Sequence, residues 1–112
     1  NEKQYVYSRQ LNISASPHPG EFELGECYPN PFNPSAQVPF SIPVESNVNI
    51  VIYDISGRFV STIMNKNLRP GNHMAKLDGS SLASGVYIVR MNATSMINNK
   101  SFSQSSKVLL LK

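Results

Sequence analysis

The chain has 112 residues, a length that fits one domain with its own hydrophobic core better than two. Its ten Lys and Arg outnumber seven Asp and Glu, but the basic residues are spread from Lys3 to Lys112 without a cluster, so no nucleic-acid partner is expected. A single cysteine, Cys27, excludes an intrachain disulfide, and the longest apolar run, residues 108–111, is too short to span a bilayer.

The sequence begins at Asn1 without an initiator Met or a signal peptide, so we expect a piece of a longer protein whose natural N-terminal partner domain is absent from this chain. Residues 1–22 are interpreted as an N-terminal strand and linker. This segment either belongs to the domain that follows or is the tail of a preceding one. Residues 23–112 are interpreted as the domain itself.

Apolar residues alternate with polar ones along much of the chain, and no long stretch repeats at helical spacing, so the fold class is predicted to be all-β. The first strand is expected over residues 5–13. Residues 14–36 contain five of the eight prolines and are expected to be irregular.

Two further strands are expected to have different neighbours. In residues 38–42, Pro39 and the following Pro43 cannot donate hydrogen bonds to a partner strand, which favours an edge position. Residues 48–55 are apolar on both parities, which is typical of a central strand covered on both faces.

Glycine-containing turns separate the strands that follow. Ser56-Gly57 is expected to close a hairpin between the central strand and a strand over residues 59–64. Pro70-Gly71 stands in the order that a type II turn prefers.

The last three strands are expected over residues 73–77, 86–93 and 102–111, with a break at residues 83–85. Seven short strands separated by turns predict a seven-stranded antiparallel β-sandwich of the immunoglobulin or fibronectin type III kind.

Candidate residues for catalysis or metal binding do not converge in the sequence. His18 and His73 have no neighbouring ligands at metal-binding spacing, so both are interpreted as surface or rim residues. Asp54 and Asp78 each stand at a turn, where a carboxylate accepts backbone hydrogen bonds. Cys27 is interpreted as a partly buried spectator. We therefore predict no enzyme activity, no cofactor and no metal.

The most distinctive segment is residues 28–34, which read Tyr-Pro-Asn-Pro-Phe-Asn-Pro. Its prolines fix φ and bias each preceding residue toward extended backbone, while its asparagines can bond to nearby amides. The segment is predicted to be a stiff lead-in, with Phe32 as the anchor that packs at one end of the sandwich.

This segment and five later blocks, in the same order, resemble the type A C-terminal sorting domain of the bacterial type IX secretion system, which is related to the immunoglobulin-like domain of flagellar hook-capping proteins. The resemblance covers about residues 22–112. The blocks are residues 28–34, 38–43, 52–60, 70–73, 82–87 and 107–112. The residues singled out as the family motif are Tyr28, Pro29, Asn30, Pro31, Phe32, Asn33, Pro34, Asp54, Gly57, Arg58, Gly71, Gly85 and Tyr87.

Three positions depart from the family pattern. Cys27 stands where the family usually has Asn, Ala36 where Thr is common, and Leu77 where an aromatic residue often sits. All three leave the predicted strands intact.

The resemblance implies an address signal rather than a catalyst. Outer-membrane export machinery would recognise the domain, a sortase-like peptidase would cut it off, and the cargo would pass through the periplasm and outer membrane to be released or attached to surface lipopolysaccharide. The cut is expected around residues 19–25, in exposed backbone outside strands. The residues that the export machinery is expected to read are Lys107, Val108, Leu109, Leu110, Leu111 and Lys112.

Two other functions were weighed. A structural immunoglobulin-like spacer or adhesion module of a cell-surface protein would differ from a sorting domain if the natural reading frame continued beyond Lys112. A carbohydrate-binding module needs an exposed aromatic platform, and the chain has no Trp, while Tyr53 and Tyr87 are predicted to lie in the core.

Overall fold

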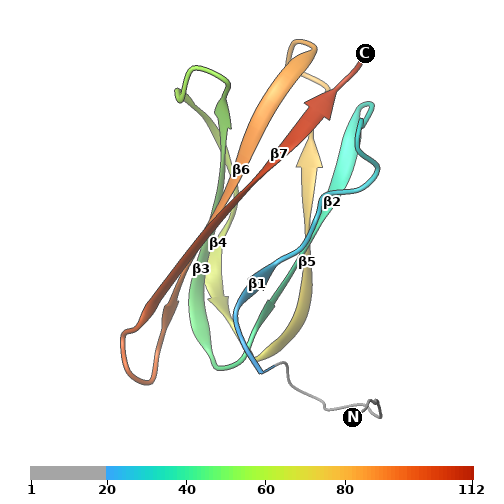
Figure 1. The fold of residues 1–112 in the computed structure, drawn as a ribbon. Coiled ribbons are helices and arrows are strands. Elements are labelled where there is room, and N and C mark those ends of the chain that lie inside the picture. The colour runs from blue at the N-terminus through green and yellow to red at the C-terminus, as the bar shows by residue number, and fades with distance from the viewer. Residues whose placement is uncertain (1–19) are drawn as a thin grey trace.

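The computed structural model describes residues 20–112, so the strand expected over residues 5–13 and His18 lie outside the described residues (Figure 1). The described residues form seven strands. They are β1 Glu23–Leu24, β2 Ser35–Ile42, β3 Ser46–Asp54, β4 Phe59–Leu68, β5 Gly71–Asp78, β6 Gly85–Ser95 and β7 Ser101–Leu110. Residues 20–112 contain no helix that could span a bilayer.

The strands form two antiparallel sheets, one in the order β1-β2-β5 and the other in the order β4-β3-β6-β7. The sheets face each other as two layers (Figure 1), so the predicted antiparallel β-sandwich of immunoglobulin-like type is confirmed. β4 lies at the edge of the four-stranded sheet.

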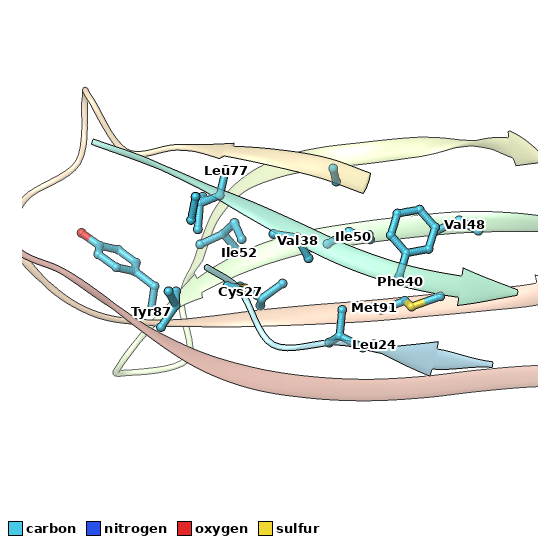
Figure 2. Close-up of a cluster of buried hydrophobic side chains, with 14 of the residues drawn as sticks. Leu24, Cys27, Val38, Phe40, Val48, Ile50, Ile52, Leu77, Tyr87 and Met91 are labelled. Atoms are coloured by element: carbon cyan, nitrogen blue, oxygen red, sulfur yellow. The ribbon is translucent and has the colours of Figure 1, made fainter. Parts of the chain in front are cut away.

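The core comes from alternate residues of facing strands. Figure 2 shows Val38 and Phe40 of β2 on one side and Ile50 and Ile52 of β3 on the other, pointing into the space between the sheets. Val38, Ile50 and Ile52 are completely buried. The period-two alternation of the sequence therefore corresponds to an inner and an outer face of each sheet.

The stretch predicted to be irregular, residues 14–36, contains β1 and the first residues of β2, so that prediction is wrong in part. β1 pairs only Glu23 and Leu24 with Ser41 and Phe40. Two residues cannot display an alternation, which is why the sequence pattern did not predict the strand.

The edge position predicted for residues 38–42 is wrong, because β2 lies between β1 and β5. Pro39 is tolerated there because β1 ends beside it. The carbonyl of Pro39 accepts a hydrogen bond from Gly25 N at 2.8 Å, and the missing N–H faces the same side, beyond the two paired residues of β1.

The central position predicted for residues 48–55 is confirmed, since β3 lies between β4 and β6. The prediction that both faces of this strand are covered is wrong in part. Val48, Ile50 and Ile52 face the core. On the other parity Val51 is buried, but Tyr53 is only half-buried and Ile55, just beyond the end of the strand, is 69% exposed. The second apolar parity of this strand therefore forms an outer surface, and the prediction that Tyr53 lies in the core is also wrong.

The hairpin predicted at Ser56-Gly57 is present and joins β3 to β4 through residues 55–58. The type II turn predicted at Pro70-Gly71 is wrong. Gly71 has a φ of 141°, whereas that turn requires about 80°. The connection instead carries the chain from β4 in one sheet to β5 in the other.

Two isoleucines test the assignment of inner and outer faces. Replacing the fully buried Ile50 with Ala is expected to lower the free energy of unfolding by about 2–5 kcal/mol, because it leaves a cavity between the sheets. Ile55→Ala, at a 69% exposed position, is expected to change it by less than about 0.5 kcal/mol. Urea titration of both variants measures the difference, and equal losses would contradict the assignment.

Candidate functional site

Most of the motif residues lie at one end of the sandwich. In the four-stranded sheet Asp54 at the end of β3 pairs with Tyr87 near the start of β6, which pairs with Val108 near the end of β7. In the other sheet Ser35 at the start of β2 pairs with Asp78 at the end of β5. We call this the C-terminal end of the sandwich; it is uppermost in Figure 1, where the chain terminates.

Three loops and the last residues of the chain build this end. The loops are residues 28–34, 55–58 and 79–84, and the chain finishes with residues 107–112. Of the motif residues, Gly71 alone lies at the opposite end, paired with Ile42 at the end of β2. Most of the motif residues, although far apart in the chain, therefore lie close together in the folded structure.

The segment of residues 28–34 binds directly to the terminal segment of residues 107–112. Phe32 N donates to the carbonyl of Leu109 at 2.8 Å, and Leu111 N donates to the carbonyl of Phe32 at 3.1 Å. These two bonds form a parallel bridge between Phe32 and Leu110. The motif therefore adds one rung of sheet to the outer edge of β7.

The side chain of Asn30 continues this pairing. Its Oδ1 accepts a hydrogen bond from Leu109 N at 3.0 Å, and its Nδ2 donates to the carbonyl of Lys107 at 3.5 Å. A side-chain amide carries the same donor and acceptor as a peptide group, so Asn30 replaces a strand residue at this edge. The outer edge of β7 is occupied between Lys107 and Leu111.

The other end of the segment is attached to the opposite sheet. Tyr28 N donates to the carbonyl of Gln37 at 3.0 Å, and Gln37 N donates to the carbonyl of Tyr28 at 2.8 Å. The peptide bonds before Pro29, Pro31 and Pro34 are all cis. The segment spans from β2 in one sheet to β7 in the other and closes the side of the sandwich.

Phe32 packs into the core beneath this segment and is 1% exposed. Gly79 makes room for it, because a Cβ atom at Gly79 would lie 2.9 Å from Phe32 Cε2 and 3.0 Å from Leu110 Cδ2. Gly79 N also donates to the carbonyl of Pro34 at 2.6 Å. Gly79 is a site residue that the sequence analysis missed, since its neighbours in the chain do not indicate such a close approach.

Apart from the half-buried Leu109, the residues of the terminal segment divide into two sets. Val108 and Leu110 are 1% and 0% exposed and belong to the core. Leu111 is 51% exposed, and the side chains of Lys107 and Lys112 also reach solvent. A protein that binds the folded domain can touch the second set but not the first.

The last residue is held in place by the loop of residues 79–84. Lys112 N donates to Ser84 Oγ at 3.0 Å, and Lys112 Nζ donates to the carbonyl of Ser80 at 2.7 Å. Near it, Tyr87 Oη donates to the carbonyl of Ala83 at 2.6 Å. This bond resembles the tyrosine corner of immunoglobulin-like sandwiches, in which a Tyr near the start of the same strand bonds to backbone a few residues upstream.

Asp54 organises the loop of residues 55–58. Its Oδ1 accepts hydrogen bonds from Ser56 Oγ at 2.6 Å, Ser56 N at 2.9 Å and Arg58 N at 3.0 Å. Gly57 has a φ of 91°, a left-handed conformation that favours glycine. The hydrogen bonds from Ser56 and from the Arg58 backbone hold the pKa of Asp54 below its ordinary value. The motif residues Asp54, Gly57 and Arg58 therefore shape a turn.

The remaining titratable candidates lie apart from one another. His73 is half-buried, stacks on Phe40 at 5.4 Å between ring centroids, and bonds through Nε2 to the carbonyl of Arg69. Burial raises the pKa of the Cys27 thiol. No group of three or more potential metal ligands occurs within residues 20–112.

The motif residues thus build one end of an immunoglobulin-like sandwich and secure its last strand, and sandwiches of this architecture are common among cell-surface domains. A family model described as the secretion system C-terminal sorting domain matches residues 26–107. That match covers most of the chain, and the chain belongs to this family, the sorting domains of type IX secretion. A search of curated proteins found no match.

Membership of this family gives the chain a role in protein secretion. It is a sorting signal that interacts with the type IX machinery, and proteins that carry it are exported across the outer membrane to the medium or the cell surface. The match stops at residue 107, so the residues that follow lie outside the matched region.

Asn30 and Asn33 provide a test of the pairing at the β7 edge. Both asparagines are exposed, but of the two only Asn30 has side-chain hydrogen bonds to β7 among the described contacts. Asn30→Ala is expected to lower the free energy of unfolding by about 1 kcal/mol and to speed hydrogen exchange at Leu109 N. Asn33→Ala should leave both unchanged. Equal exchange at Leu109 in the two variants would contradict the proposed role of Asn30.

Asp54 is expected to make stability depend on pH. Because its pKa is lowered in the folded chain, the ionised form stabilises the fold above the ordinary pKa of about 3.9, and this contribution disappears as pH falls through the lower folded value. Asp54→Asn should therefore be less stable than the unsubstituted chain at pH 7, with the gap closing as the pH falls through the lowered folded pKa of Asp54. Chemical denaturation at several pH values measures the gap.

Arg58→Gln is the matched control for this pH dependence. It removes an exposed ion pair of 3.8 Å but keeps the backbone N–H that bonds to Asp54. Exposed ion pairs contribute little to stability, so the pH dependence should remain. Its disappearance in this variant would show that the ion pair, and not the hydrogen bonds, causes it.

Proposed function

We propose that this chain is a non-catalytic export signal whose exposed terminal side chains are read by the type IX machinery. The observation that supports this most directly is the attachment of residues 107–112 to the folded domain through Asn30 and Phe32. That attachment presents Lys107, Leu111 and Lys112 in one geometry at one end of the sandwich. A preordered segment binds with a smaller loss of conformational entropy than a free tail.

We further propose that a sortase-like peptidase cuts the chain just ahead of the sandwich. Gly20 and Glu21 are exposed and lie outside the strands. From Phe22 onward the chain is held, first by the stacking of Phe22 on Phe102 at 5.4 Å and then by β1. Proteases cut exposed, unpaired backbone, so the expected region narrows to the residues before Phe22.

The step after the cut rests on the family resemblance alone. The cargo is either released or attached to surface lipopolysaccharide, and any chemistry belongs to the cargo. The proposed cut and the terminal segment lie at opposite ends of the sandwich, since Glu23 pairs with Ser41 near the end of β2, whereas Leu110 pairs with Phe32, just before the start of β2. A cargo joined ahead of Gly20 is therefore attached at the end of the sandwich opposite to the terminal segment.

Two exposed apolar side chains allow a controlled test. We would fuse the 112-residue chain behind a periplasm-targeted reporter in a type IX-competent bacterium and measure the reporter at the surface and in the medium. Leu111→Asn, at a 51% exposed position, is expected to lower delivery several-fold, because that side chain lies within the proposed recognition segment. Ile97→Asn, 74% exposed at the opposite end, should not change it.

Point variants are preferable to deletion of residues 108–112, because the deletion would remove Val108 and Leu110 from the core and unfold the domain. Equal delivery by the Leu111 and Ile97 variants would rule out a direct role for Leu111. A reporter that stays in the periplasm with the unsubstituted chain would rule out the sorting signal and favour a structural spacer.

A further inference from the structure

The outer face of the four-stranded sheet carries apolar side chains that the core does not use. Tyr53 on β3 pairs with Phe59 on β4 and with Ile88 on β6, so the three lie side by side across the sheet. The Tyr53 and Phe59 rings meet edge to face at 6.5 Å. Phe59 is 61% exposed, and Ile55 in the adjoining loop is 69% exposed. We call these four residues the outer patch.

A hollow of about 270 Å³ lies beside the outer patch, lined by Tyr53, Gly57, Ile88, Arg90 and Ser105. Gly57 leaves it open, because nothing lies within 4 Å of the place where a Cβ atom would stand. Sites for drug-sized molecules usually exceed about 300 Å³. A hollow of this size suits a side chain of a protein partner, the arrangement in which a buried anchor residue dominates binding.

The charges around the hollow are mostly positive. Arg90 lines it, Lys107 lies opposite Ile88 on β7, and Arg58 extends from the adjoining turn. The strands β3, β4, β6 and β7 together contain a single acidic residue, Asp54, whose carboxylate is bound within its own turn. The face therefore complements a negatively charged partner.

The outer patch is continuous with the terminal segment. Lys107 pairs with Ile88, and Leu109 pairs with Val86, on the same outer face of the sheet. The edge of β7 is closed to strand addition by Asn30 and Phe32, and Val108 and Leu110 point into the core. A partner protein that approaches the outer face of the sheet can therefore contact the terminal segment and the neighbouring strands at the same time.

We propose that the outer patch and its hollow form a docking site for an acidic protein surface of the export machinery, which inserts one apolar side chain into the hollow between Tyr53, Ile88 and Arg90. This inference rests on the proposed export function and extends the recognised surface from the last strand to β3 and β6. The anchor supplies affinity, and Arg90 and Lys107 orient the partner and raise the rate of association.

Charge reversal tests the electrostatic part in the reporter fusion. The double variant Arg90→Glu and Lys107→Glu is expected to lower surface delivery about tenfold, because it opposes an acidic partner. The double variant Lys66→Glu and Lys76→Glu changes the net charge equally on exposed positions away from the hollow and should retain delivery. Equal delivery by the two double variants would overturn the proposal.

A substitution that fills the hollow tests the proposed insertion of an apolar side chain. Ser105 lines the hollow, and Ser103 is the next outward residue on β7; both are exposed. Ser105→Trp should reduce delivery about tenfold by occupying the anchor position, whereas Ser103→Trp should not. Neither position is in the core, so both variants should fold, which resistance of the fusions to trypsin verifies. Normal delivery by Ser105→Trp would overturn the proposal.

The experiment separates this proposal from the export function itself. If the unsubstituted chain fails to deliver the reporter, the export function is wrong. If it delivers and all four variants match it, only the docking site is wrong. Loss of retention of the Arg90 and Lys107 double variant on heparin-agarose, with delivery unchanged, would show that the face binds an anionic glycan and would also overturn the proposal.

Discussion

The arrangement of this domain depends on the pairing of residues 28–34 with the final strand. Phe32 contributes a buried ring to the core and, through its backbone, two hydrogen bonds to β7. Asn30 supplies two more from its side chain, and Gly79 provides the space that the ring needs. An edge strand with open backbone groups can pair with other chains. Here the molecule fills that edge with its own motif.

The terminal segment contains both buried and exposed side chains. Val108 and Leu110 stabilise the sandwich, and substitution at either changes the whole fold. Lys107, Leu111 and Lys112 present their side chains to solvent from a backbone that is held on both sides. Under the proposed export function, a terminal substitution would therefore act through one of two distinct physical causes, loss of the folded domain or loss of a contact with the machinery.

The outer face of the four-stranded sheet gives a second surface at the same end. A strand that is apolar on both parities usually lies between two layers. In β3 only one parity faces the other sheet. The outward residue Tyr53 remains at the surface beside Arg90, and Ile55 in the loop after β3 is exposed as well. Exposed aromatic and Arg side chains around a hollow are typical of protein interfaces.

The sequence alone was sufficient for the fold class, for six of the seven strands described by the structure and for the central place of β3, because these depend on alternation and turn residues that are local. The family blocks could also be read directly from the chain. The sequence did not indicate β1, which is only two residues long. It also did not indicate that β2 lies in the middle of its sheet, because Pro39 suggested an edge. The tertiary structure alone decided that Asn30 and Phe32 bind β7, that Gly79 admits Phe32, and that Tyr53 faces outward. These contacts join residues far apart in the chain, and local patterns carry no information on which distant backbone group, ring or sheet face will be adjacent once the two sheets have packed.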